Sequence, residues 1–279
     1  MSAAPLLEVE ALDVAFPGRG RLTHAVRGVS FALGRERLGI VGESGSGKST
    51  TGRAILGLVP WPGMVSAKRL TLGGIDLMAL RPHEWLGIRG RRISMVMQDP
   101  KYSLNPVVKI GEQIMETYRL HRRGSRREAR RRALDMLDAV RIRDPDLVFH
   151  RYPHQLSGGM GQRAMIAMML IAEPDLLIAD EPTSALDVTV QNHVLGILDE
   201  LVAERGMGLI FISHNLTIVS SFCDRVLVMY GGRIVEECAA SGLAAARHPY
   251  TRALIAAAPS IDRPKAELTT ITRDPAWLQ

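Results

Sequence analysis

The chain has 279 residues, 46% of them hydrophobic, with a formal net charge of +6. This length and composition allow a substantial buried core, whereas the longest apolar run, Ala164 to Ala172, is about half of what a membrane-spanning helix needs. The N-terminus has neither the basic start nor the apolar centre of a signal peptide, and two cysteines fit a reducing compartment, so we expect a globular cytoplasmic protein.

The first segments alternate apolar and polar residues, as half-buried strands do. This pattern covers LLEVEALDVAF (residues 6–16) and VRGVSFAL (26–33). RLTLGGIDLMAL (69–80) predicts two short strands joined by a turn at Gly73 and Gly74. The chain is therefore expected to open with antiparallel strands.

A strand, a glycine-rich loop and a helix are predicted next. Arg37 to Val41 is a short apolar run, and STTGRAILGLV (49–59) has a helical apolar pattern. The residues expected on one helical face are Ala54, Ile55, Leu58 and Val59.

The loop GESGSGKST (42–50) matches the phosphate-loop pattern G-x-x-x-x-G-K-[ST] in the strand-to-helix context that the pattern requires. Its glycines let successive backbone N–H groups point at a phosphate, and the helix N-terminus adds its dipole. Lys48 would lie between the β- and γ-phosphates, and the Ser49 hydroxyl would be a ligand for Mg²⁺. The predicted ATP-binding residues are Gly42, Gly45, Ser46, Gly47, Lys48, Ser49 and Thr50.

From about Glu112 to Val140 the pattern is helical and highly charged. Eight arginines lie between Arg119 and Arg132, and Glu128 is the only acidic residue among them. A solvated helix face is the favoured interpretation, and binding to anionic lipid headgroups is the alternative. The absence of interleaved aromatic residues argues against stacking on single-stranded nucleic acid.

Apolar strands alternate with helices in the second half of the chain. Strands are predicted at DLLIAD (175–180) and GLIFIS (208–213), with helices over 161–171 and 188–204. The first helix carries three methionines that we expect in the core, Met165, Met168 and Met169. Such alternation predicts a parallel sheet covered on both faces.

The strand that ends at Ala179 is followed by two adjacent carboxylates. Ligands of open α/β sheets bind at the carboxyl ends of the strands. Asp180 is therefore predicted to hold Mg²⁺, directly or through water, and Glu181 to polarise the water that attacks the γ-phosphate.

These motifs, with MVMQDP (95–100), LSGGM (156–160), SALD (184–187) and FISHN (211–215), resemble those of the ATP-binding cassette (ABC) ATPases over about residues 6–240. The resemblance implies the α/β fold of ABC-type P-loop NTPases. That fold has a RecA-like core with a mainly parallel sheet, an N-terminal antiparallel β subdomain and a helical subdomain.

The resemblance also implies roles for single residues. Phe16 would stack on adenine, and Gln98 would sense Mg²⁺ and the attacking water. Asp187 would lie in the loop after the acidic pair, and His214 would contact the γ-phosphate.

In this family two cassettes pair head to tail, so the signature loop, LSGGM (156–160), would bind the nucleotide of the partner. Ser157 and the N–H groups of Gly158 and Gly159 start a helix and form a donor cluster without a fixed cation. Such a cluster suits a γ-phosphate that Lys48 and Mg²⁺ of the other chain already neutralise.

One branch of the family matches more closely, namely the ATPase subunits of dipeptide, oligopeptide and nickel importers. Met160 replaces the commoner glutamine, as in that branch, while Gly161 stands where the branch usually has a larger polar residue. The matching segments are QDPKYSLNP (98–106), PHQLSGGM (153–160), IADEPTSALDVTVQ (178–191) and RHPYTRALIAAAPS (247–260). We expect a cassette over 1–245, with a helical subdomain at about 99–162, and a C-terminal extension over 246–279.

The resemblance implies an ATP-hydrolysing subunit that powers import of peptides or a related small solute, bound peripherally to the cytoplasmic face of the inner membrane. Its partners would be a second ABC ATPase subunit, identical or homologous, two transmembrane permeases and a periplasmic solute-binding protein, with no specific nucleic acid. The region between Gln98 and Ser157 would dock on the permease. A soluble ABC ATPase acting on nucleic acid or ribosomes and an exporter ATPase are the alternatives. Peptide, nickel chelate, glutathione and opine-like solutes all remain open.

Overall fold

The computed structural model of the protein describes residues 4–18, 20–184, 186–257 and 277. The chain divides into two compact units, which are described one at a time below: Met1–Leu80 with Ile210–Gln279, and Arg81–Leu209. Among the described residues, no helix combines the length and the apolar character that crossing a bilayer demands. The expected domain boundaries at 99–162 and 246–279 remain predictions, and 258–276 lie outside the described residues.

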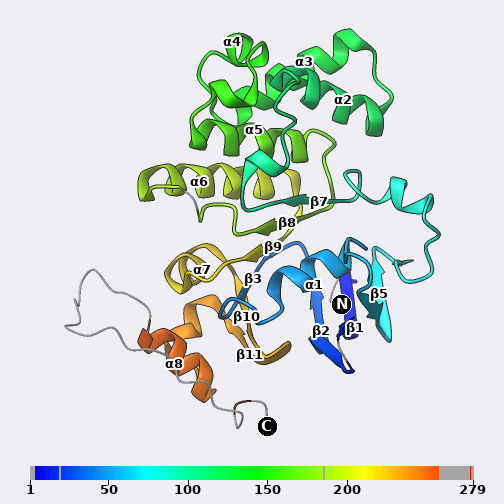
Figure 1. Cartoon of the computed structure of the whole chain (residues 1–279). Coiled ribbons are helices and arrows are strands. Elements are labelled where there is room, and N and C mark those ends of the chain that lie inside the picture. The colour runs from blue at the N-terminus through cyan, green and yellow to red at the C-terminus, as the bar shows by residue number, and fades with distance from the viewer. Residues whose placement is uncertain (1–3, 19, 185, 258–276, 278–279) are drawn as a thin grey trace. The chain divides into compact units, whose positions relative to one another are not determined.

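The first unit contains an antiparallel sheet with the strand order β2-β1-β5-β6, in which β4 also pairs with β1 (Figure 1). The strands are β1 (Leu7–Pro17), β2 (Leu22–Leu33), β4 (Met64–Ser66), β5 (Arg69–Leu72) and β6 (Ile75–Asp76). The predicted alternation holds in two stretches, because Leu7 and Val9, and then Leu12 and Val14, are buried. A register shift between Val9 and Leu12, where Ala11 has φ 50°, separates the two stretches. Gly73 and Gly74 both have positive φ, 52° and 82°, as a two-residue hairpin turn requires.

A second sheet in this unit carries the phosphate loop. Its strands β3 (Arg37–Val41) and β10 (Arg225–Tyr230) pair in parallel, and β11 (Arg233–Ala239) pairs antiparallel with β10. The prediction of β3 is confirmed at both ends, whereas β10 and β11 were not predicted. The helices of this unit are α1 (Lys48–Ile55), α7 (Leu216–Phe222) and α8 (Pro249–Ala257).

The predicted extension of α1 beyond Ile55 is wrong. Gly57 adopts a left-handed conformation with φ 62°, and its N–H group bonds to the carbonyl of Ala54. A left-handed glycine is a common helix terminator, because it costs glycine no steric strain. Leu58 therefore leaves the expected apolar face and is 45% exposed.

The second unit combines two parallel strands with five α-helices among its described residues. Strands β7 (Ile93–Val96) and β8 (Leu176–Asp180) pair in parallel. The helices are α2 (Ile110–Arg122), α3 (Arg126–Ala139), α4 (Pro145–Phe149), α5 (Gly158–Leu170) and α6 (Val188–Arg205). In Figure 1 the helices α2, α3, α4 and α5 lie together as one cluster.

The charged stretch from Glu112 to Val140 is two helices with a break between them. Arg123 is left-handed with φ 51°, and the Ser125 side chain then caps α3 by accepting a bond from the Glu128 N–H group. The sequence pattern did not separate these helices because both flanks carry the same charge.

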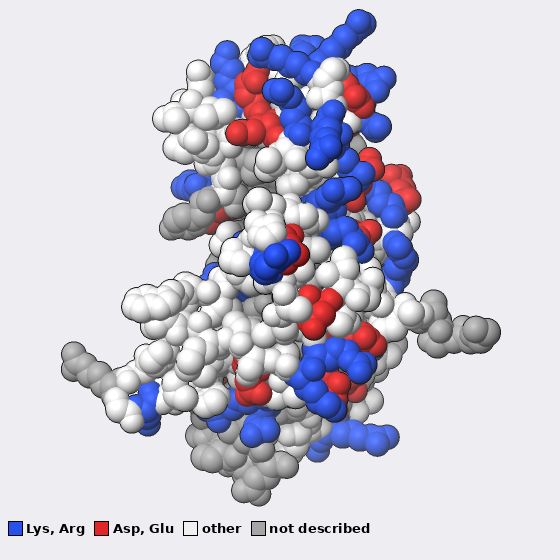
Figure 2. Space-filling model, turned by 90° about the vertical axis from the view of Figure 1, so that its right-hand side faces the viewer, with Lys and Arg blue, Asp and Glu red and all other residues white. Residues whose placement is uncertain are grey.

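Basic side chains gather over α2 and α3 (Figure 2). Arg126 and Arg130 pair with Glu112 (3.5 Å) and Asp146 (3.0 Å). Four further arginines are exposed, and their side chains form no hydrogen bond or ion pair with any described residue: Arg119, Arg123, Arg127 and Arg131. This exposure supports a solvated face, and lipid binding remains an untested alternative.

Helix α5 begins three residues earlier than predicted, at Gly158. Met165 and Met168 lie in the core as expected, while Met169 is only half-buried.

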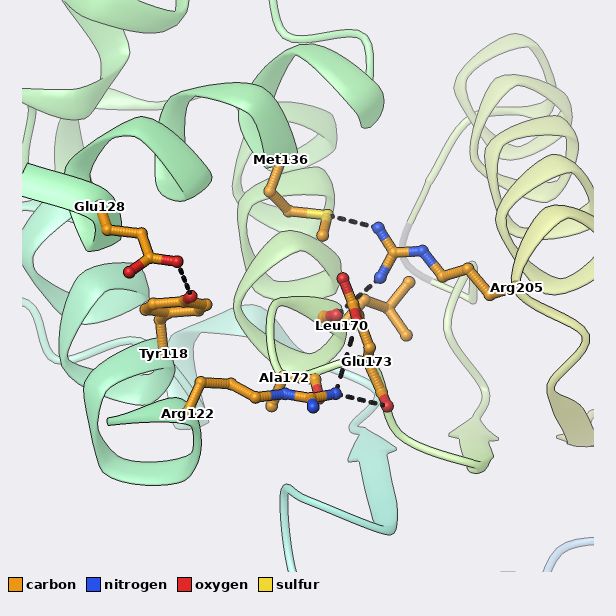
Figure 3. Close-up of polar contacts among 8 residues, drawn as sticks. All are labelled: Tyr118, Arg122, Glu128, Met136, Leu170, Ala172, Glu173 and Arg205. Atoms are coloured by element: carbon orange, nitrogen blue, oxygen red, sulfur yellow. Dashed lines mark hydrogen bonds and ion pairs between the residues drawn. The ribbon is translucent and has the colours of Figure 1, made fainter. Parts of the chain in front are cut away.

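Two arginines bind the carbonyl groups at the C-terminal end of α5 (Figure 3). Arg122 of α2 donates to the carbonyl of Ala172 from Nε (3.0 Å) and Nη2 (2.6 Å), and Arg205 of α6 donates to that of Leu170 (2.8 Å). The last carbonyls of a helix lack partners within the helix and carry the negative end of its dipole. Positive side chains at this end therefore stabilise α5.

Candidate active site

The phosphate loop connects β3 to α1 in the first unit. Gly42 has φ 151° and Gly47 has φ 104°, both in the region that other residues adopt only with strain. A Cβ atom at Gly42 would lie 2.2 Å from the carbonyl oxygen of Met229, and one at Gly47 would lie 2.5 Å from that of Ala25. Both glycines of the sequence pattern are thus required by the backbone around them.

Lys48 lies inside the curve of this loop and is only 5% exposed. Its Nζ atom donates to the carbonyls of Gly42 (2.8 Å) and Glu43 (2.7 Å) and lies 3.4 Å from Oγ of Ser46. Ser46 is buried as well, whereas Ser49 is half-buried and a Cβ at Gly45 would meet open space. The ammonium group is therefore held in the loop by the loop's own oxygens.

Two contacts also hold the phosphate loop from outside. The N–H group of Gly232, in the turn between β10 and β11, donates to the Ser46 carbonyl at 3.0 Å. The hydroxyl of Tyr250, in α8, accepts a hydrogen bond from the Glu43 N–H group at 2.9 Å. Sequence reasoning missed both contacts, because no motif or spacing links these residues to the loop.

Phe16 and His214 belong to the same unit as the loop. Phe16 is half-buried near the end of β1. Its ring packs on Gly63, because a Cβ atom added at Gly63 would lie 2.7 Å from Cε1 of Phe16. His214 is exposed and follows β9 (Gly208–Ile212). The next residue, Asn215, caps α7.

The acidic pair lies at the end of β8 in the second unit. Asp180 is the last residue of the strand and is 6% exposed. Glu181 has a left-handed backbone with φ 48°, which is uncommon for a residue other than glycine and concentrates at functional sites. Gln98, which follows β7, donates from Nε2 to Oε2 of Glu181 at 3.3 Å. Two predicted catalytic side chains are thus in contact.

The signature loop starts α5 in the same unit. Ser157 is exposed and caps this helix by accepting a bond from the Met160 N–H group at 3.4 Å. Gly158 is exposed, and the N–H groups of the first helical residues have no acceptor within the helix. A Cβ at Gly159 would lie 2.6 Å from Val190 of α6, so this glycine allows the two helices to approach closely.

Asp187 also serves as a helix cap. Its side chain accepts a bond from the Val190 N–H group at 3.0 Å and starts α6. Gly161 is buried, and a Cβ there would make ordinary contact with Pro100 at 3.6 Å. An alanine would therefore fit at Gly161, so close packing does not require a glycine here.

The residues predicted to bind Mg²⁺ offer suitable ligand atoms. Mg²⁺ prefers oxygen ligands and commonly takes one or two side chains together with substrate phosphates. Ser49 supplies a hydroxyl, Asp180 a carboxylate and Gln98 an amide oxygen. These three oxygen ligands therefore fit Mg²⁺ that is bound together with the nucleotide.

Comparison with known proteins gives the family. Residues 26–184 match the model of the ABC transporter family. The chain is 47% identical to the probable peptide ABC transporter ATP-binding protein y4tR of Sinorhizobium fredii, over 91% of this chain and 77% of that protein. It is 44% identical to the dipeptide transport ATP-binding protein DppD of Escherichia coli, over 95% and 82% of the two chains.

Solved structures agree with these relatives. A dimeric post-hydrolysis structure of the ATP-binding cassette MJ0796, bound to ADP and Pi, superimposes with a TM-score of 0.75 and 26% identity, covering 84% of this chain and 98% of that one. The chain therefore belongs to the ABC transporter family, as an ATP-hydrolysing cassette with the α/β fold of that family.

Proposed function

We propose that the protein hydrolyses ATP to drive the import of peptides or a related small solute. The observation that carries this proposal is the 44–47% identity to ATP-binding proteins named for peptide and dipeptide transport, over more than nine-tenths of the chain. Transport ATPases with other cargo share the cassette, so the substrate class rests on these relatives.

Each predicted residue of the nucleotide site would have a separate role. Lys48 would bind the β- and γ-phosphates, Ser49 and Asp180 would hold Mg²⁺, and Glu181 would polarise the attacking water. The contact between Gln98 and Glu181 supports this assignment, because Gln98 is expected to touch both the metal and the water. When bound, Mg²⁺ would neutralise charge that develops on the transferred phosphoryl group.

Adenine would stack on Phe16, and His214 would contact the γ-phosphate. Both side chains are accessible enough to do so, since Phe16 is half-buried and His214 is exposed.

The signature loop would complete the site of a second cassette, identical or homologous. Exposed Ser157 and Gly158 at the start of α5 would donate hydrogen bonds to a phosphate of the partner's nucleotide. The dimeric state of the related cassette MJ0796 supports this arrangement. Asp187 would lie near the same interface, since its helix packs against Gly159 through Val190.

The transporter would also need two transmembrane permeases and a periplasmic solute-binding protein. The protein would then lie on the cytoplasmic face of the inner membrane, docked through the region between Gln98 and Ser157. Val107 supports this surface, because it is 77% exposed in the segment between η2 (Pro100–Tyr102) and α2.

Purifying the protein with its permeases and binding protein tests the proposal. The solutes to compare are di- and tripeptides, glutathione and a nickel chelate, with the ATP hydrolysis rate as the measurement. We expect a peptide to stimulate hydrolysis, and omission of the binding protein to abolish the stimulation. Failure of every solute, together with salt-sensitive co-sedimentation with ribosomes, would instead favour the nucleic-acid alternative.

A further inference from the structure

A buried tyrosine connects the C-terminal segment to the phosphate loop. Tyr250 lies in the first turn of α8 and is 0% exposed. Its hydroxyl accepts the 2.9 Å hydrogen bond from the N–H group of Glu43, which is 207 positions away in the chain. Both residues belong to the first unit.

The backbone of Glu43, together with that of Gly42, orients the loop lysine. The Glu43 carbonyl accepts a bond from Nζ of Lys48 at 2.7 Å and another from the N–H group of Ser46 at 3.1 Å. The N–H group and the carbonyl of Glu43 flank the same Cα atom. The Glu43 N–H group shares one planar peptide unit with the carbonyl of Gly42, which also accepts a bond from Nζ of Lys48 at 2.8 Å, so tilting this peptide moves a carbonyl that Lys48 contacts.

Tyr250 is itself held firmly. Its ring packs on Tyr230, the last residue of β10, with centroids 4.4 Å apart, and on Trp277 at 5.5 Å. The Glu236 carboxylate of β11 accepts bonds from the N–H groups of Arg247 (2.7 Å) and His248 (3.3 Å) just before α8. The hydroxyl thus reaches the loop from a fixed support.

We infer that Tyr250 is a positioning residue for ATP binding. It fixes the Glu43 peptide, and through it Lys48, in the arrangement that receives the phosphates. The inference rests on the role proposed above for the phosphate loop. Because the loop binds phosphates before as well as during the reaction, loss of this support weakens substrate and transition state alike, which raises KM with little change in kcat.

The test replaces only the hydroxyl, by Tyr250→Phe. The ring and its packing on Tyr230 stay, while the half-buried N–H group of Glu43 loses its acceptor. The matched control is Tyr118→Phe, which removes the same atom from a buried tyrosine of α2 whose hydroxyl bonds to Glu128 at 2.8 Å. The measurements are the Kd for a fluorescent ATP analogue, KM and kcat for ATP, and the thermal midpoint without nucleotide.

We expect Tyr250→Phe to raise Kd and KM about tenfold, which corresponds to about 1.4 kcal/mol, with kcat changed less than about twofold. Tyr118→Phe should keep the wild-type Kd. The inference would be overturned if Tyr250→Phe bound ATP with the wild-type Kd, whether or not its thermal midpoint fell. It would also be overturned if both variants lost ATP affinity equally. Nucleotide binding by the wild type tests the proposed role of the phosphate loop. The ratio of the Kd of Tyr250→Phe to the Kd of the wild type tests the role of Tyr250.

Discussion

Replacing Arg205 by methionine tests how the end of α5 is stabilised. Methionine keeps an unbranched apolar stem of similar length and a similar helix propensity, but it has no donors. The substitution removes the 2.8 Å hydrogen bond to the carbonyl of Leu170 and the 3.7 Å contact between Nη2 and Sδ of Met136 (Figure 3).

The expected loss follows from these contacts. Hydrogen bonds to charged groups contribute about 1.5–3 kcal/mol, and a cation at a helix end adds a few tenths. Burial lowers the pKa of the Arg205 guanidinium, so part of this gain is offset by desolvation. The Leu170 carbonyl also keeps its hydrogen bond from the N–H group of Glu173 at 2.9 Å, so the substitution does not leave it without a partner. We therefore expect a net loss of about 1–2 kcal/mol in the free energy of unfolding.

Thermal unfolding followed by circular dichroism measures this loss. For a protein of this size 1 kcal/mol shifts the midpoint by about 2–4 °C, so Arg205→Met should unfold about 2–8 °C below the wild type. The matched control is Arg131→Met on α3, an exposed arginine whose side chain bonds to no described residue. This variant should stay within about 0.5 kcal/mol of the wild type. Equal midpoints for the two variants would refute the reasoning.

Three further predictions concern catalysis, pairing and thiol chemistry. Glu181→Gln should still bind ATP but lose about 10² or more in kcat, and near-normal hydrolysis would contradict its role as the catalytic carboxylate. Ser157→Arg should leave ATP binding by the isolated chain largely intact but prevent ATP-driven dimerisation, measured by light scattering; loss of binding by the monomer would exclude the contact in trans. Burial raises the pKa of Cys223 to about 12 and also raises that of Cys238, which leaves Cys223 with about 10⁻⁴ thiolate at pH 8. Iodoacetamide should therefore modify half-buried Cys238 first in the native protein and reach Cys223 only after unfolding, as peptide mass spectrometry can check.

The sequence revealed those parts of the site whose chemistry requires particular residues at fixed spacing. The phosphate loop was recognisable because Gly42 and Gly47 must adopt backbone angles that other residues avoid. The acidic pair was recognisable because a buried strand ends there. Contacts such as that of Tyr250 with Glu43 had no such signal, because they join segments that only the folded chain brings together.

Element ends were harder to predict than elements. Leu58 continues the apolar period of α1, but the left-handed Gly57 stops the helix before it. The start of α5 was placed three residues late because Gly158 and Gly159 resemble a loop in composition. Their position is explained by the capping side chain of Ser157 and by the close approach of Val190.

The contacts at both ends of α5 have a mechanical consequence. Near its start Gly159 packs on Val190 of α6, and at its last residue, Leu170, the carbonyl accepts a hydrogen bond from Arg205 of α6. The two helices therefore run side by side in the same direction, joined at each end over a length of about 20 Å. They should turn as one rigid body, so that any rotation of Ser157 also moves Asp187, the cap of α6. Arg205 lies at the C-terminal end of α6, whereas the signature loop lies at the start of α5. A substitution at Arg205 would then change how two cassettes fit together without contacting either nucleotide.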